Sequence, residues 1–230
     1  MLFRSRPAPV QVNLLLMGSF GMDAIGWAIG DDLLTPAGSE RDFSERLDRI
    51  DLAFAFDPLL PTPPVTALPA AGGFGVTFAS LNQTSKLSPR CIQTWARILA
   101  RVPKSRLLLK GRAYADATVA GRIRTAFARH GIEGRRLDLR GWTVTQATHL
   151  DTYRKVDIAL DPFPYGGVIT TCEAMWMGVP VVSLEGDRVL GRYGSAFLKA
   201  VGLAELAAAD ESTYVDAAVA LASDRKRTRL

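Results

Sequence analysis

The chain has 230 residues, of which 48% are hydrophobic and 22% are charged, a balance typical of a globular protein. This length predicts one large domain, or one domain with an appendage. There is no run of about 18 apolar residues, which excludes a membrane-spanning helix. The first ten residues, MLFRSRPAPV, lack the apolar region of a secretory signal. Two cysteines are too few for a disulfide scaffold, so we expect a reducing, cytoplasmic location.

The net charge of +5 and the pI of about 9.5 suit an arginine-rich enzyme as well as a nucleic-acid-binding protein. The one dense basic run is at the C-terminus, where Arg225, Lys226, Arg227 and Arg229 cluster. An exposed helix end explains this run better than a nucleic-acid or membrane tail. We therefore expect neither nucleic acid nor membrane as a partner.

The first 70 residues carry an irregular pattern. Residues 10–17 predict a strand, residues 27–30 form a short apolar run, and the polar segment 39–50 is expected to be helical in part. Five prolines between Pro58 and Pro69 predict an extended linker. We therefore expect residues 1–70 to form an N-terminal extension and residues 71–230 a separate unit.

From residue 71 onward, strand and helix patterns alternate. Ser88 followed by Pro89 combines a helix N-cap with proline at the first helical position. The predicted strands are 76–80, 106–110, 137–139, 157–160 and 181–184, and the predicted helices are 89–102, 116–131, 146–155, 170–177, 192–201 and 212–222. Parallel strands need helical crossovers, so this alternation predicts an α/β fold with a doubly wound, Rossmann-like parallel sheet.

Ligands of such sheets bind beyond the carboxyl ends of the strands, and the loop Leu81–Lys86 (LNQTSK) lies at one of these ends. Its Lys86 precedes a helix start, so the cation and the helix N-terminus could face one anion. An ordinary polar surface loop is the alternative. The sequence contains no GxGxxG fingerprint with a suitably spaced acid and no Walker A loop, and its two histidines make a histidine-based metal site improbable.

The segment Asp161–Glu173 (DPFPYGGVITTCE) follows the next strand. Thr170 and Glu173 match the capping-box pattern T-x-x-E, which is a purely structural interpretation. In the functional interpretation, the helix N-terminus and a threonine hydroxyl bind a phosphate while Glu173 accepts hydrogen bonds from sugar hydroxyls. The pattern leaves both open.

Three weaker features complete the survey. His149 is either a structural residue or one that stacks on, or hydrogen-bonds to, a base. The loop 185–192 (EGDRVLGR) suits a phosphate- or sugar-facing loop as well as a surface turn. Cys91 and Cys172 are expected to be small buried residues, because no His, Asp or Asn nearby in the sequence supports a nucleophile.

Several of these segments together resemble the C-terminal catalytic region of the O-GlcNAc transferase / SPINDLY family, especially its bacterial members. The resemblance extends from Pro7 to the end, and DPFPY followed by TTCEAxWMGVPVV is its most specific part. The matching runs are TFASLNQTSK from Thr77, TWARILARVPKSRLLLKG from Thr94, RLDLRGW from Arg136, VDIALDPFPYGG from Val156 and TTCEAMWMGVPVVSLEGDR from Thr170.

This resemblance implies a GT-B glycosyltransferase that transfers a sugar from a nucleotide-sugar donor to Ser or Thr hydroxyls of proteins, with inversion and without a metal or other cofactor. UDP-GlcNAc is the favoured donor and GDP-fucose the second choice, and tetratricopeptide repeats are expected upstream in full-length relatives. By motif position, Lys86 is the catalytic lysine on the diphosphate. The remaining donor-binding residues implied are Gln83 beside it, His149 at the base, Thr170 and Thr171 at the phosphates and Glu173 at the ribose.

The sequence departs from the family pattern in two ways. Bacterial members usually read FPYNGTTTTCEA, whereas here Gly166, Val168 and Ile169 replace the asparagine and two threonines, and Val189 replaces a common histidine. Fewer polar contacts to a phosphate predict weaker donor binding. Residues 1–70 resemble only the end of the N-terminal lobe, so we expect a fragment. A catalytically inactive remnant that acts as a folded binding module is the alternative.

Overall fold

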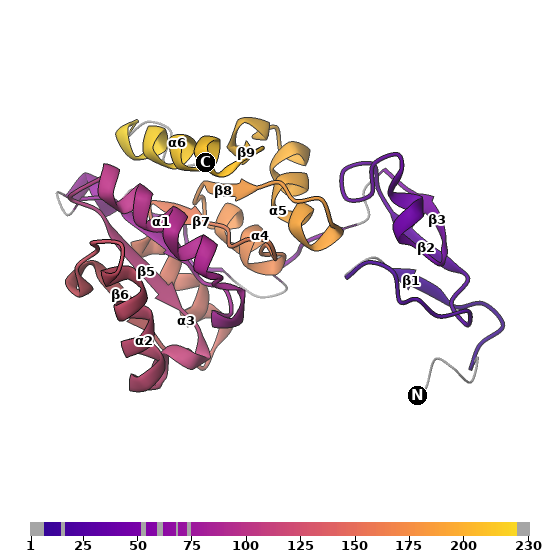
Figure 1. The fold of residues 1–230 in the computed structure, drawn as a ribbon, viewed down its shortest axis with the longest axis horizontal. Helices are drawn as coiled ribbons and strands as arrows, with labels where there is room; N and C mark the ends of the chain where they lie inside the picture. Colours follow the sequence, from indigo (N-terminus) through magenta and orange to yellow (C-terminus); the bar gives the residue numbers. More distant parts are fainter. Residues whose placement is uncertain are drawn as a thin grey trace.

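The computed structural model describes residues 7–14, 17–51, 54–58, 62–67, 69–72 and 75–224. It contains a small parallel sheet near the N-terminus and a larger α/β body, seen at the right and left of Figure 1. The basic run 225–229, Leu15 and Leu16 of the expected first strand, and Pro61 of the linker lie outside the described residues.

The small sheet has the order β1-β2-β3 with all strands parallel. It consists of β1 (Val12–Leu14), β2 (Trp27–Gly30) and β3 (Arg46–Arg49). The expectation for residues 39–50 was incomplete, because a short 3-10 helix at Ser39–Asp42 is followed by strand β3. Strand β3 is too short and polar to be recognised by alternation, and its pairing with β2 is what makes it a strand.

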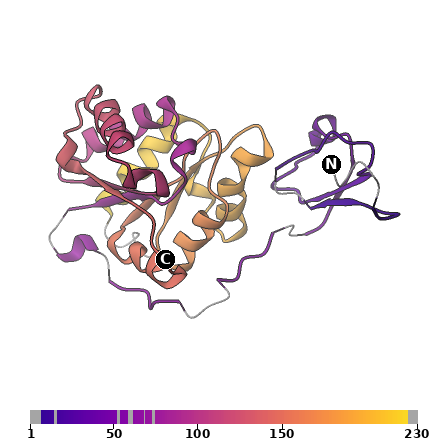
Figure 2. The ribbon, with the colours of Figure 1, turned by 90° about the horizontal axis from the view of Figure 1, so that it is seen from below.

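The linker between the two sheets runs along the underside of the α/β body in Figure 2. Its described part, residues 54–58 and 62–67, has no regular structure, and a 3-10 helix covers Pro69–Gly72. Phe54 packs against Tyr193 and Phe197 with ring centroids 6.0 and 4.9 Å apart. Ala28 of β2 and Leu34 of the segment that follows β2 belong to the same apolar cluster.

The larger sheet has six parallel strands in the order β6-β5-β4-β7-β8-β9. Its strands are β4 (Thr77–Ser80), β5 (Arg106–Lys110), β6 (Leu137–Arg140), β7 (Ile158–Leu160), β8 (Val181–Leu184) and β9 (Ala207–Ala208). This is the doubly wound 3-2-1-4-5-6 order, whose winding reverses between β4 and β7. The predicted α/β class is confirmed, and only the two-residue β9 was missed.

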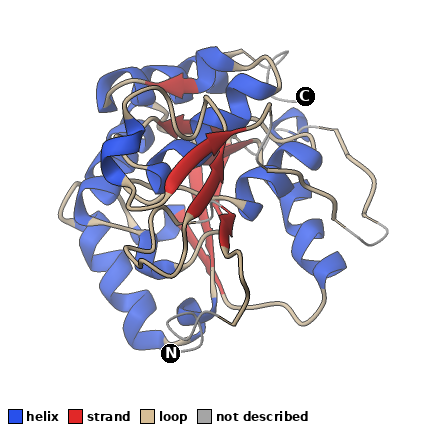
Figure 3. Ribbon diagram, turned by 90° about the vertical axis from the view of Figure 1, so that its right-hand side faces the viewer, coloured by secondary structure: helices blue, strands red, loops and turns tan. Residues whose placement is uncertain are grey.

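Helices cover both faces of this sheet, as Figure 3 shows. They are α1 (Pro89–Arg101), α2 (Ala117–Ala128), α3 (Gln146–Leu150), α4 (Ile169–Trp176), α5 (Val189–Ala200) and α6 (Glu211–Ser223). The expected helix 146–155 is α3 followed by a 3-10 helix at Asp151–Lys155, and α5 begins three residues earlier than predicted.

The local signals act as the sequence indicated. The Ser88 hydroxyl caps α1 by accepting from the Cys91 amide at 3.1 Å. Gly131, with φ +77°, follows the end of α2, where a left-handed conformation suits glycine. Trp95 of α1 is buried and donates to the Tyr214 hydroxyl of α6 at 3.1 Å, which joins two helices distant in sequence. Cys91 and Cys172 are buried free thiols, as expected.

Candidate functional site

Lys86 lies where the winding of the sheet reverses, in a 3-10 turn (Thr84–Lys86) that follows β4. Its Nζ donates to the Gly166 carbonyl at 2.7 Å and lies 3.9 Å from the centre of the Tyr165 ring. Partial burial lowers the pKa of Lys86, and the nearby Asp161 charge opposes that shift. The ammonium is therefore beside the turn that leads into α4.

The first turn of α4 has no side-chain cap. Helix α4 begins at Ile169, and its N-cap residue Val168 has no side-chain oxygen to cap it. The capping-box interpretation of Thr170 and Glu173 is therefore wrong, because Thr170 lies inside the helix and Glu173 turns to other partners. An uncapped helix N-terminus has amide groups and a positive dipole end that attract an anion.

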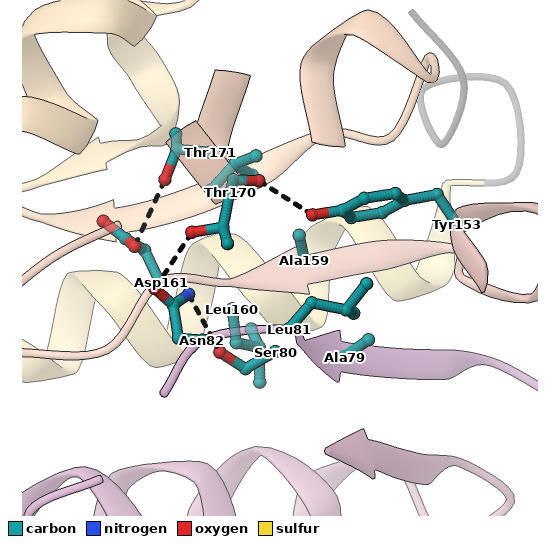
Figure 4. Close-up of a pocket in the computed structure, with 11 residues that line it drawn as sticks. Ala79, Ser80, Leu81, Asn82, Tyr153, Ala159, Leu160, Asp161, Thr170 and Thr171 are labelled. Carbon is teal, nitrogen blue, oxygen red and sulfur yellow. Dashed lines mark hydrogen bonds between the residues drawn. The ribbon is translucent and has the colours of Figure 1, made fainter. Parts of the chain in front are cut away.

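Thr170 is bound to the loop after β4. Its hydroxyl donates to Asn82 Oδ1 at 2.9 Å, and the Asn82 amide donates to Ser80 Oγ at 3.3 Å, as Figure 4 shows. The Tyr153 hydroxyl donates to the Thr170 carbonyl at 3.0 Å. These residues surround a cavity of about 10 Å³ between the ends of β4 and β7, so the two predicted phosphate loops do meet at one edge.

Asp161 is a buried carboxylate beneath this edge that the sequence did not single out. It accepts from the Gly167 amide at 2.6 Å, from Thr171 Oγ1 at 3.3 Å and from Ser183 Oγ at 2.7 Å. Burial raises its pKa to about 6 despite these three donors. In the sequence, only its position directly after a strand marked Asp161, because its hydrogen-bond partners lie in the following loop, in α4 and in β8. Thr171 thus points into the protein toward Asp161, whereas Thr170 points toward the loop of Asn82 (Figure 4).

Gly194 of α5 packs against this carboxylate. A Cβ at Gly194 would lie closer than 3.0 Å to both Asp161 Oδ2 and Ser183 Oγ. We therefore expect Gly194→Ala to lower the free energy of unfolding by about 1–3 kcal/mol, the usual cost of overpacking. Urea denaturation measures this change in the free energy of unfolding. The matched control is Gly121→Ala in α2, where a Cβ meets nothing within 4 Å. It should raise stability by about 0.4–1 kcal/mol, and equal effects at both glycines would contradict the prediction.

His149 is 9% exposed and lies in the middle of a buried polar chain. Its Nδ1 is 3.0 Å from Lys110 Nζ and its Nε2 is 3.0 Å from Glu173 Oε2. A charged ammonium can only donate, so Nδ1 accepts and Nε2 carries the proton that it donates to Glu173. Gln146 donates to the other Glu173 oxygen at 2.7 Å. Both ring nitrogens of His149 are thus occupied, which leaves only its ring face for a ligand.

Lys110, at the end of β5, is the second residue that the sequence did not single out. It is 2% exposed and also donates to Thr143 Oγ1 at 2.9 Å and Thr152 Oγ1 at 3.1 Å. Burial lowers its pKa to about 8, with the Glu173 charge opposing the shift, so it remains mostly protonated at neutral pH. A lysine that ends the apolar run Leu107–Leu109 was a usable signal, because the carboxyl end of a parallel strand is where ligands bind.

A pocket of about 650 Å³ opens beside the hydrogen-bonded side chains of Lys110 and His149. Its walls are the loop 81–85 after β4, residues 110–113 at the end of β5 and just after it, Trp142 and His149. The exposed Gln83 lies in its lining, and Asn82 borders both this pocket and the cavity near Thr170. The pocket and the cavity near Thr170 are therefore neighbours on the two sides of Asn82.

The loop 185–192 faces the small sheet. Arg188 pairs with Asp42 at 3.0 Å, and Arg192 Nη1 donates to the Leu34 carbonyl at 3.4 Å. Within the described part of the chain, no group of three or more His, Cys, Asp or Glu residues could hold a metal ion. No helix of that part has the length and apolar character needed to cross a membrane.

This doubly wound sheet, with its polar loops at the switch point, is a Rossmann-like lobe of the GT-B glycosyltransferase type. Its structure resembles that of a variant of the Thermobaculum terrenum O-GlcNAc transferase, with a TM-score of 0.87 and 36% identity, over 97% of this chain and 44% of that one. It also matches Staphylococcus aureus TarM at 12% identity and a TM-score of 0.59, which supports the fold alone.

The chain belongs to glycosyl transferase family 41, whose model matches residues 67–230. It is 38% identical to SPINDLY of Petunia hybrida and 37% identical to SPINDLY of Arabidopsis thaliana, each over 221 residues, or 95% of this chain. Both are named probable UDP-N-acetylglucosamine–peptide N-acetylglucosaminyltransferases. The chain spans 24% of the length of these relatives. The resemblance noted in the sequence is thus confirmed at the level of the family.

Proposed function

We propose that this chain is the nucleotide-sugar-binding part of a protein O-glycosyltransferase. UDP-GlcNAc is the favoured donor, in keeping with the names of the relatives, and GDP-fucose is the alternative. The acceptor is a Ser or Thr hydroxyl of a protein, and upstream tetratricopeptide repeats would belong to the longer protein. The main support for this proposal is that the Lys86 ammonium lies 2.7 Å from the Gly166 carbonyl, next to the uncapped start of α4.

In this proposal the diphosphate lies between Lys86 and the first turn of α4. Transfer of the sugar leaves a nucleoside diphosphate on which negative charge grows. A lysine and a helix dipole aimed at that charge stabilise the transition state more than the ground state. An ammonium has three donors, so Lys86 can keep its bond to Gly166 and still donate to a phosphate oxygen. No metal is needed for this charge stabilisation.

The nucleoside then occupies the pocket of about 650 Å³. Gln83 lines this pocket, and His149 presents its ring face because its two nitrogens are bound to Lys110 and Glu173. This favours stacking over hydrogen bonding as the role of His149. The role of Glu173 at the ribose stays a prediction, because its carboxylate is buried, does not line this pocket and already accepts from Gln146 and His149.

Calorimetric titration of the 230-residue chain with UDP and with GDP tests the binding part of the proposal. Saturable binding of one of them, with a fall in affinity as salt rises, is expected for a charge-dominated site. Failure of both to bind would contradict the proposal. A turnover assay with labelled UDP-GlcNAc or GDP-fucose and a Ser/Thr peptide then separates an active lobe from the alternative, a binding module that has lost activity along with the polar residues replaced by Gly166, Val168 and Ile169.

A further inference from the structure

Trp142 is an exposed aromatic side chain in the lining of the 650 Å³ pocket. It follows β6, and 58% of it is exposed. By contrast, Trp95 is fully packed in the core, and Trp176, which is 50% exposed, contacts the linker through Phe56 and Thr62. The indole N–H of Trp142 has no acceptor among the described residues. The ring therefore stays largely exposed at the pocket surface.

Two neighbours of Trp142 help to form one wall of the pocket and give that wall its chemical character. The Arg112 guanidinium lies 4.8 Å from the centre of the Trp142 ring in a cation–π contact. The His149 ring lies 6.2 Å away at an angle of 33°. Arg112 forms no ion pair with any other part of the chain that the structure describes. The wall thus combines flat ring surfaces with unpaired guanidinium donors.

A nucleobase is the ligand that matches such a wall. Every base has a flat π-face that stacks on aromatic rings and on guanidinium groups, and its edge carries carbonyl or ring-nitrogen acceptors for N–H donors. The wall lies on the side of the pocket formed by the segments after β5 and β6, whereas Lys86 follows β4. A diphosphate bound at Lys86 would place its nucleoside in the space between.

We propose that Trp142, with Arg112 stacked on it, forms the wall against which the nucleobase of the donor packs, so that Trp142 determines much of the nucleotide affinity. This inference rests on the proposed nucleotide-binding function and assigns the residue that holds the base. It differs from the His149 assignment, because His149 is fixed within the protein while Trp142 is exposed until a base covers it.

The test is calorimetric titration of wild type, Trp142→Phe and Trp142→Ala with UDP, GDP and inorganic pyrophosphate. Trp142→Ala should weaken the binding of the preferred nucleotide by about tenfold or more, the usual loss when a stacking aromatic is removed. Trp142→Phe should retain most of the affinity, because it keeps a flat ring. Pyrophosphate has no base, so its affinity should be the same in all three proteins.

The matched control is Trp176→Ala, which removes a similarly exposed tryptophan outside the pocket and should leave nucleotide affinity unchanged. Wild-type binding with an unchanged Trp142→Ala affinity would overturn the inference and leave the proposed function standing. A parallel loss of pyrophosphate affinity would also overturn it, because Trp142 would then act through the fold. If the wild type binds neither nucleotide, the proposed function fails and the inference fails with it.

Discussion

Replacing Lys86 by alanine is expected to weaken the binding of UDP or GDP by roughly tenfold to a hundredfold or more. Hydrogen bonds to charged groups contribute about 1.5–3 kcal/mol, and 1.4 kcal/mol corresponds to a factor of ten in affinity. Partial burial of Lys86 strengthens this effect, since water screens its charge less than that of a surface lysine. Calorimetry of the purified variant measures the loss directly.

The control for this variant is Lys104→Ala. Lys104 is exposed and precedes β5, so it lies at the opposite edge of the sheet from the site. Its removal lowers the net charge by the same amount and should change nucleotide affinity little. Equal affinities of Lys86→Ala and wild type would exclude the diphosphate role of Lys86, and with it the main support for the proposed function. In the proposed transferase reaction, the same change should lower turnover by about 10²–10³.

Replacing Asp161 by alanine is expected to destabilise the chain by about 2–5 kcal/mol and to abolish nucleotide binding. The change leaves the buried Gly167 amide and Ser183 hydroxyl without their acceptor, at about 1–3 kcal/mol for each group. It also frees the glycine turn whose Gly166 carbonyl holds Lys86. Urea denaturation measures the stability. Asp151→Ala, at an exposed ion pair, should shift it by less than about 0.5 kcal/mol.

Asp161 also predicts a dependence of stability on pH. Its pKa is raised from 3.8 to about 6 in the folded protein, so between these values the folded state binds a proton that the unfolded state has released. The contribution of Asp161 to the free energy of unfolding is therefore largest below about pH 4. It falls by about 3 kcal/mol as pH rises toward 6.

Asp161→Asn removes this contribution because asparagine does not titrate. The stability of wild type relative to this variant should fall as pH rises from 4 to 7, and urea denaturation at several pH values measures the difference. A difference that is constant over this range, or that grows in favour of the wild type, would contradict the raised pKa. If the Asp161→Ala variant has the same stability to urea as wild type, the Asp161 carboxylate does not stabilise the turn at Gly166 and Gly167.

The local sequence was sufficient for most elements of the larger sheet. The Ser88–Pro89 start, the apolar stripe of α1 and the apolar run of β5 each contain their signal within a few neighbouring residues. Helical periodicity and capping depend on nearby side chains, which is why the order of residues is enough to reveal them. The motifs around DPFPY and TTCEA likewise indicate the family by their residues alone.

The residues missed are those defined by contacts over long distances in the chain. Asp161 binds Gly167 locally but Ser183 and Gly194 only because β7, β8 and α5 pack together. The Lys110–His149–Glu173 chain joins three elements, and the T-x-x-E pattern that resembled a capping box instead places Glu173 against His149. Strand β3 and strand β9 are stabilised by pairing with a neighbour rather than by their own residues.

The amino-acid sequence alone therefore specified the α/β class, the order of its elements, the family and the two loops that meet at the switch point. Which side chains point at one another was settled by folding, since burial and hydrogen bonding depend on the packing of distant segments. The buried charge of Asp161, the tautomer of His149 and the exposed ring of Trp142 all belong to this second group. Each is a property of its surroundings, and those surroundings exist only once the sheet has formed.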